Sequence, residues 1–235
     1  MKVALGTWGF YKDNSSEDIE EVLKHAIKRG VYNFDTALVY GNQAAEKVIG
    51  KICKQHNNLL IRVTTKIPGK IKPYEGCCMK DIYDVDWMHR CLECSINNLG
   101  NIDTILLHNW STEFKTNEFE PVLNCLKEFK NKGLCNNIGV SLPNGYGVMP
   151  QDAVVDACDV FMLPYNEKND WGKTVGLKLK ESSKKIMIRS IFLSGQSVPE
   201  SETLKRKIVS SAAFADEIVF GTTSRVHLDE LLEMI

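Results

Sequence analysis

The feature that most constrains the fold of this chain is a regular alternation of short apolar runs with longer stretches of helical periodicity. Eight such pairs follow one another over 235 residues, so each pair averages about 30 residues, the size of one strand–helix unit. The runs that we predict as strands begin near Val3, Tyr32, Leu59, Asp103, Asn137, Val160, Ile186 and Glu217. Such alternation is typical of a parallel sheet covered by helices. We therefore predict an α/β fold, a single compact (β/α)8 TIM barrel, with residues 1–235 forming one domain.

An open, doubly wound sheet is the structural alternative. Dinucleotide-binding sheets of that class carry a G-x-G-x-x-G pattern after the first strand, and none follows Gly6 here. The stretch from Ser15 to Asp18 resembles a capping box and predicts the start of the first helix, for which Gly30 is the expected stop.

The charge pattern argues against a nucleic-acid or membrane partner. The formal net charge is −1, and acidic and basic residues are interspersed rather than gathered in a basic cluster. The longest apolar runs have the length of strands, well short of a transmembrane helix. The first predicted strand follows Met1 too closely for a signal peptide, so we expect a cytoplasmic protein.

The eight cysteines are expected to be reduced thiols in that compartment. Cys91 and Cys94 have the CxxC spacing that some zinc sites use. However, Cys91 falls on a helical apolar stripe with Met88 and Leu92, where cysteine behaves as a small hydrophobe. We predict a core position for Cys91 and no metal site.

Three predicted strands end on polar side chains that can take part in catalysis: Asp35, Lys66 and His108. The carboxyl ends of the strands of a barrel meet on one rim, so these side chains are expected to lie close together. Each has an ordinary alternative, since a strand-end Asp can cap a helix, a Lys is usually solvated and a His can be satisfied in the core. Their joint placement favours a functional site.

Tyr40, five residues after Asp35, completes a set suited to carbonyl reduction. A tyrosine has an unperturbed pKa of about 10. The ammonium of Lys66 beside it is expected to lower that pKa toward the working range, and Asp35 would keep Lys66 charged. His108 would orient a carbonyl oxygen by hydrogen bonding. The set could deliver a proton to a carbonyl or remove one from an alcohol.

Beyond this set, the chain resembles the aldo-keto reductases over nearly its full length. The matching pieces are Leu5-Gly6-Thr7-Trp8, Phe34-Asp35-Thr36-Ala37, Tyr40-Gly41, Glu46, Ile49-Gly50, Thr65-Lys66, Leu106-Leu107-His108, Ile138-Gly139-Val140-Ser141 and Gly221-Thr222-Thr223-Ser224. The resemblance implies the barrel fold. It also implies that the family's catalytic tetrad is Asp35, Tyr40, Lys66 and His108, with Tyr40 as the general acid.

The resemblance further implies a nicotinamide cofactor, NADPH or NADP rather than NADH, whose hydride goes to the carbonyl carbon of a small substrate. Ser141 would contact the carboxamide, and the turn from Gly221 to Arg225 would hold the phosphates. The full set of implied cofactor-binding residues is Gly6, Thr7, Trp8, Ser141, Arg189, Ser190, Gly221, Thr222, Thr223, Ser224 and Arg225. The expected substrate pocket is lined by Trp8, Phe10 and Trp110.

Several positions depart from the family pattern. Leu142 stands where an Asn is frequent, and Met162 where a Gln usually holds the carboxamide. Arg189 replaces a ring-stacking tyrosine, and its planar guanidinium could stack in its place. Thr223 stands where an arginine is often found, so Arg225 is the expected partner of a 2′-phosphate. The N-terminal hairpin and the C-terminal substrate loop of the family are expected to be absent, which would leave the pocket open.

Three functions remain as hypotheses. The first is an NADPH-dependent reductase of an aldehyde or ketone, with sugar-derived carbonyls as candidates. The second is an NAD(P)-dependent dehydrogenase of an aldose or alcohol, and the third is a cofactor-binding regulatory module with little turnover. For the assembly we expect a monomer or a weak homodimer.

Overall fold

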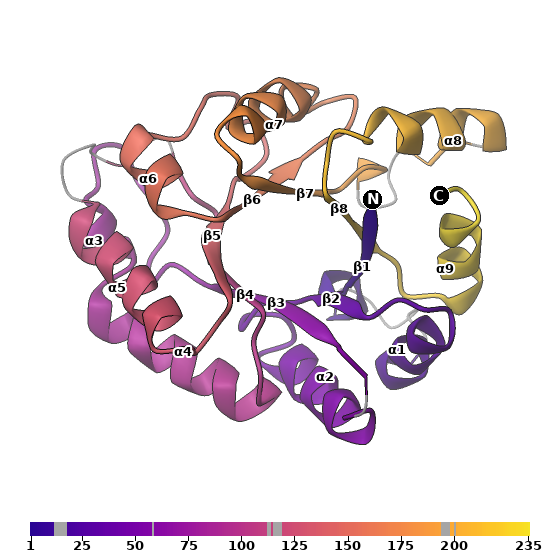
Figure 1. Cartoon of the computed structure of the whole chain (residues 1–235), viewed down its shortest axis with the longest axis horizontal. Helices are drawn as coiled ribbons and strands as arrows, with labels where there is room; N and C mark the ends of the chain where they lie inside the picture. The colour runs from indigo at the N-terminus through magenta and orange to yellow at the C-terminus, as the bar shows by residue number, and fades with distance from the viewer. Residues whose placement is uncertain (12–17, 58, 112–113, 115–118, 194–197, 200) are drawn as a thin grey trace.

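The structure, a computed structural model, is an eight-stranded closed barrel with helices around its outside (Figure 1). It describes residues 1–11, 18–57, 59–111, 114, 119–193, 198–199 and 201–235. All strand pairs are parallel and follow sequence order around the barrel. The predicted (β/α)8 barrel is thereby confirmed.

The strands are β1 (Lys2–Gly6), β2 (Asn33–Asp35), β3 (Arg62–Ile67), β4 (Thr104–His108), β5 (Asn137–Ser141), β6 (Val160–Pro164), β7 (Lys185–Arg189) and β8 (Glu217–Gly221). The barrel closes where β1 pairs with β8, in a register that runs from Lys2 opposite Glu217 to Gly6 opposite Gly221. Figure 1 shows the N-terminus beside β8 as a result.

The helices in the described residues are η1 (Trp8–Tyr11), α1 (Ile19–Lys28), α2 (Ala44–Gln55), α3 (Met79–Ile82), α4 (Val85–Leu99), α5 (Glu120–Asn131), α6 (Asp152–Ala157), α7 (Trp171–Glu181), α8 (Glu202–Ser211) and α9 (Arg225–Leu232). The N-cap of α1 is Asp18, whose side chain accepts a hydrogen bond from the Glu20 backbone N–H at 2.7 Å. Ser15 of the predicted capping box lies outside the described residues. Among the described residues, no helix is long and apolar enough to cross a membrane.

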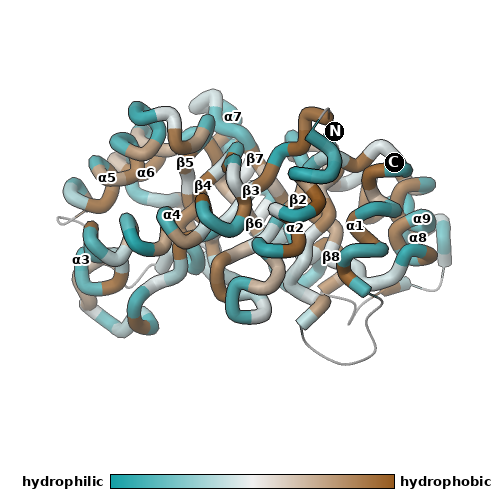
Figure 2. The backbone as a smooth tube through the Cα atoms, turned by 90° about the horizontal axis from the view of Figure 1, so that it is seen from below, coloured by the Kyte–Doolittle hydropathy of each residue, from teal (hydrophilic) through white to brown (hydrophobic). Residues whose placement is uncertain are grey.

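Two apolar clusters fill the two sides of the strand layer. The larger lies between the strands and the helices and includes Phe34, Ile105 and Phe161, all at most 1% exposed. Its helical members recur at helical spacing, which Figure 2 shows as brown stretches alternating with teal along the tube. The core position predicted for Cys91 is confirmed, since this residue is 2% exposed.

The smaller cluster consists of alternate strand residues that point into the barrel: Ala4, Leu106, Val160, Met162, Met187 and Val219. Every second residue of a strand points into the barrel. By this period, the inward residues next to the apolar cluster, on its C-terminal side, are Asp35, Lys66, His108, Ser141 and Arg189. They stand at the carboxyl ends of their strands, and we call this end the carboxyl mouth. The apolar layer therefore forms a floor beneath polar side chains.

Candidate functional site

A buried ion pair lies at the centre of the carboxyl mouth. The Lys66 ammonium donates to the Asp35 carboxylate at 2.6 Å and to the Thr36 backbone carbonyl at 2.6 Å. Lys66 is 1% exposed and Asp35 is 5% exposed. Burial alone lowers the pKa of Lys66, but Asp35 and Tyr40 raise it more, so the pKa lies above its usual value. Lys66 is therefore a charged ammonium, which Asp35 holds in a fixed position.

Tyr40 approaches this charge from the loop between β2 and α2. The Lys66 nitrogen lies 5.1 Å from the centroid of the Tyr40 ring. After Tyr40 the backbone takes three consecutive left-handed residues, with φ of 58° at Gly41, 51° at Asn42 and 74° at Gln43. A Cβ at Gly41 would come within 2.4 Å of the Tyr11 ring, so a glycine is required to let the loop turn there.

The acidity of Tyr40 differs from the sequence-based expectation. Burial raises the pKa of Tyr40, and the neighbouring Lys66 lowers it by less, so the net direction is upward. The prediction that Lys66 would bring this pKa below its ordinary value is therefore wrong in its net direction. The reason is desolvation of the phenolate, which the sequence does not reveal. Lys66 still makes the phenol a better acid than it would be without that charge.

His108 faces Tyr40 from the end of β4, with ring centroids 6.0 Å apart in an edge-to-face arrangement. Burial, followed by the charges of Lys66 and Arg189, lowers the pKa of His108 to about 3. The imidazole is therefore neutral at physiological pH and can donate a hydrogen bond without carrying a charge. Its backbone carbonyl accepts a hydrogen bond from the hydroxyl of buried Tyr83, which fixes the end of β4.

Glu46 supports the same region from α2. It is fully buried and accepts hydrogen bonds from Thr65 at 2.6 Å, Ser95 at 2.8 Å and Asn98 at 3.0 Å. These partners belong to β3 and α4, so Glu46 connects three elements. Glu46 is recognisable in the sequence only as part of a family pattern, and no sequence pattern singles out Tyr83.

Arg189 extends from the end of β7 toward β5. Its guanidinium donates to the Leu142 carbonyl at 2.9 Å, to the Asn144 side-chain oxygen at 3.2 Å and to the Ser190 hydroxyl at 3.2 Å. Leu142 thus contributes its backbone at the mouth, while its side chain is buried. Met162, opposite Ser141 in the sheet register, is fully buried in the barrel interior.

The other residues expected to bind a cofactor lie around the same mouth. Gly6 and Thr7 end β1, and the Thr7 hydroxyl donates to the Asp35 carbonyl at 3.1 Å. Ser190 has a left-handed φ of 60° directly after β7. Gly221 ends β8, and the turn Thr222, Thr223 and Ser224 leads to exposed Arg225, the first residue of α9.

The three aromatic residues expected to line the substrate pocket differ in exposure. Trp8 is 47% exposed on η1, whereas Phe10 is 8% exposed. Trp110 is fully buried and packs its ring against Phe114 at 5.2 Å and Phe119 at 5.6 Å. Trp110 therefore has no exposed surface to offer a substrate, and ordinary aromatic packing explains its position.

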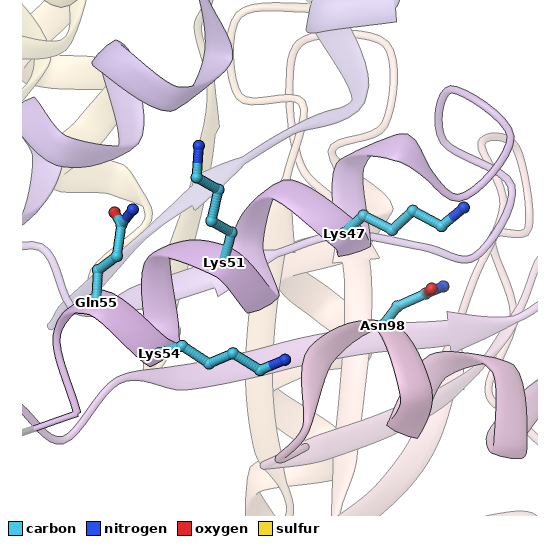
Figure 3. Close-up of a pocket in the computed structure, with 5 residues that line it drawn as sticks. All are labelled: Lys47, Lys51, Lys54, Gln55 and Asn98. Carbon is cyan, nitrogen blue, oxygen red and sulfur yellow. The ribbon is translucent and has the colours of Figure 1, made fainter.

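Two cavities lie away from the mouth. A groove of about 410 Å³ on the outside of the barrel is lined by Lys47, Lys51, Lys54, Gln55 and Asn98 (Figure 3). Lys51 there is paired with Glu20 at 2.6 Å, and the lining has the character of a solvated surface. A cavity of about 650 Å³ at the opposite, amino end of the barrel is lined by residues that include Lys2, Arg62 and Glu217. Neither cavity includes a member of the expected tetrad.

Comparison with known proteins identifies relatives of this chain. The model of the aldo/keto reductase family matches residues 2–149. Probable aldo-keto reductase 1 of Glycine max is 30% identical over 140 residues, which are 58% of this chain and 39% of the relative. Aldo-keto reductase yakc (NADP(+)) of Schizosaccharomyces pombe is 29% identical over 140 residues, 58% of this chain and 40% of the relative. The chain thus spans about two fifths of the length of these curated relatives.

The barrel also superposes on solved structures. A putative aldo-keto reductase from Pseudomonas aeruginosa has a TM-score of 0.76 at 20% identity, with 99% of this chain and 88% of that chain covered. At this identity the likeness shows the fold.

Proposed function

Because the chain belongs to the aldo/keto reductase family, we propose that it is an NADPH-dependent oxidoreductase that reduces an aldehyde or ketone, such as a sugar-derived carbonyl, to an alcohol. Its carbonyl substrate is small, in keeping with the family. The relative from Schizosaccharomyces pombe has NADP(+) in its name, which supports the choice of cofactor.

The observation that carries this proposal is the position of Lys66 between Asp35 and Tyr40. Asp35 holds the ammonium at 2.6 Å, and the ammonium lies 5.1 Å from the Tyr40 ring centroid. As a proton leaves the phenol, negative charge develops on Tyr40, and a preformed positive charge stabilises it without reorganisation. Tyr40 then acts as the general acid that protonates the carbonyl oxygen.

His108 has a separate role in this proposal. Because the pKa of His108 is lowered to about 3, its imidazole is neutral. It therefore does not compete with Tyr40 as a general acid, which would require the protonated imidazolium. A neutral imidazole N–H can hydrogen-bond the carbonyl oxygen and orient it toward Tyr40. The bound nicotinamide would supply the hydride, which is chemistry that protein side chains cannot provide.

Groups at the carboxyl mouth fit such a cofactor. Neither the Ser141 hydroxyl nor the His108 imidazole has a hydrogen-bond partner among the described residues, so both can serve a ligand. A side chain added at Gly221 would meet nothing within 4 Å, which leaves that backbone open. We propose that Ser141 holds the carboxamide and that the turn from Gly221 to Arg225, at the start of α9, holds the phosphates. Gly6, Thr7, Trp8, Arg189 and Ser190 complete the proposed contact set.

The alternatives share this site and differ in turnover. A dehydrogenase of an aldose or alcohol would run the same proton transfer in reverse, with Tyr40 accepting the proton of the alcohol hydroxyl. A binding module with little turnover gains weight from the raised pKa of Tyr40 and from apolar Met162, which cannot hydrogen-bond a carboxamide as an amide side chain would. We further propose that residues 1–235 act as one domain, as a monomer or weak homodimer in the cytoplasm.

Two measurements separate these functions. NADPH binding is followed by quenching of its fluorescence, and turnover by loss of reduced-nicotinamide absorbance with a panel of aldehydes and ketones. Binding with turnover supports the reductase, whereas binding without turnover in either direction favours the module. A protein that binds neither NADPH nor NADP would overturn the proposal.

A further inference from the structure

We propose that Arg189 makes the carboxyl mouth select the reduced, uncharged nicotinamide over the oxidised pyridinium cation. The inference rests on the proposed function, because it concerns the cofactor of that site. It assigns Arg189 a role in discriminating between the two redox states, in addition to contact with the ring.

The first step is the charge at the mouth. Asp35 offsets the charge of Lys66 through the 2.6 Å ion pair, and His108 is neutral. Arg189 instead bonds to neutral oxygens, those of Leu142, Asn144 and Ser190. Within the described part of the chain, no carboxylate forms an ion pair with Arg189. The charge of Asp35 acts on Arg189 as well as on Lys66. One carboxylate thus faces two cations, and the mouth carries one positive charge in excess.

The second step is the location of that charge. Arg189 donates to the backbone carbonyl of Leu142. Leu142 is the next residue after Ser141, the proposed partner of the carboxamide. The charge of Arg189 also reaches His108, since it contributes to the lowered pKa of that residue. A nicotinamide that passes hydride to a carbonyl held by Tyr40 and His108 must lie within a few ångström of these same groups. Arg189 is thus a close neighbour of the ring position.

The third step is elementary electrostatics. The reduced ring is neutral and has a π-face that a guanidinium can approach favourably. The oxidised ring carries a positive charge that Arg189 repels. At an effective dielectric constant of about 20 and a separation of about 6 Å, the repulsion corresponds to about hundredfold weaker binding of the cation. Partial exposure of Arg189 to solvent reduces this factor toward about tenfold.

The test measures dissociation constants rather than turnover. NADPH and NADP are titrated into the wild-type protein and into Arg189→Gln, whose side chain is polar but carries no charge. We expect the ratio of the NADP constant to the NADPH constant to fall about tenfold or more in Arg189→Gln. Arg189→Lys, which keeps the charge, should retain most of the wild-type ratio. Arg189→Met provides a second neutral variant if Arg189→Gln does not fold.

Lys185→Met is the matched control. It removes one positive charge from the exposed amino end of the same strand, where Lys185 contacts Asn137 at 3.0 Å. Its ratio should equal that of the wild type. An unchanged ratio in the neutral Arg189 variants, or an equal change in Lys185→Met, would overturn the inference. Failure of the wild-type protein to bind either cofactor would instead overturn the proposed function.

Discussion

The Glu46 carboxylate accepts a 2.6 Å hydrogen bond from Thr65, the residue directly before Lys66 in β3. Glu46 stands six residues after Tyr40, near the start of α2. The hydrogen bond therefore links α2, which follows Tyr40, to β3, which carries Lys66. Because Glu46 also accepts from Ser95 and Asn98 of α4, one buried carboxylate of α2 satisfies donors from two further elements.

Glu46→Ala should destabilise the fold strongly. It leaves the Thr65 and Ser95 hydroxyls without their acceptor, removes one of the two acceptors of the Asn98 amide and creates a buried void. We expect a loss of about 3 kcal/mol in the free energy of unfolding. Chemical denaturation measures the loss. Glu93→Ala, an exposed change on α4, is the control and should cost little. Equal losses in the two variants would show that the Glu46 network contributes nothing to stability.

Tyr40→Phe should abolish carbonyl reduction while cofactor binding stays nearly intact. The change removes one hydroxyl and keeps the ring against His108 and Lys66. Loss of proton transfer predicts a rate decrease of at least about 10²–10⁴-fold. Single-turnover hydride transfer, followed by reduced-nicotinamide absorbance, gives the rate, and fluorescence titration gives the affinity. Near-wild-type hydride transfer in this variant would mean that another group protonates the substrate.

Lys66→Met should reduce both rate and stability. The phenol loses the charge that favours its ionisation, and Asp35 becomes a buried carboxylate without a cation, which typically costs about 3–5 kcal/mol. The double variant Asp35→Asn with Lys66→Met should recover part of the stability and none of the rate. Denaturation curves and single-turnover rates of both variants provide the comparison. Recovery of the rate in the double variant would remove Lys66 from the proposed mechanism.

Arg225→Ala should weaken NADPH binding by more than NADH binding. Arg225 is exposed on the first turn of α9, and we propose that it contacts the 2′-phosphate, which NADPH carries and NADH lacks. Titration of both cofactors into wild type and variant gives the two losses. Arg206→Ala, on exposed α8 and paired there with Glu202, serves as the control for removal of a surface arginine. Equal losses for both cofactors would exclude the 2′-phosphate role.

The free energy of unfolding of Glu217→Gln should increase relative to that of the wild type as the pH rises. Burial, with the nearby charge of Asp35, raises the pKa of Glu217 from 4.5 to about 7, against the weaker effect of Lys2. Below pH 4.5 the carboxyl is protonated in both the folded and the unfolded protein, so its raised folded pKa does not reduce stability there. Stability is then lost as the pH rises toward 7, because the unfolded chain releases the proton first. Relative to wild type, the variant should gain on the order of 2 kcal/mol between pH 4.5 and pH 8.

The measurement is denaturation at both pH values, with Glu181→Gln on the exposed face of α7 as the control. A Glu217→Gln gain that does not depend on pH would show that the carboxyl titrates at its ordinary value.

The sequence revealed the repeated architecture but not all of its contacts. The predicted starts of β5 and β8, Asn137 and Glu217, coincide with the observed ones, because a polar residue precedes each apolar run. In contrast, α3 spans only four residues, too few to show a helical period, and was not predicted. The contact of Arg189 with the Leu142 carbonyl joins β7 to the loop after β5, and no local pattern encodes such a contact.

The net direction of the Tyr40 pKa shift also could not be predicted from the sequence. The proximity of Lys66 to Tyr40 follows from strand order, but the degree of burial that raises the Tyr40 pKa follows only from packing. Likewise, Trp110 is separated from His108 by one residue and still points into the core against Phe114.

The pairing of β1 with β8 has a consequence for how the chain is made. Leu5 lies opposite Phe220, so the two edges that complete the barrel are among the most distant segments of the sequence. During synthesis, β1 lacks its second neighbour until β8, the last of the eight strands, has been translated. Contacts of such long sequence separation form slowly, since the loop that they close is long. The nascent barrel therefore exposes an unpaired strand edge until β8 is made, which is the stage at which a chaperone would have most to protect.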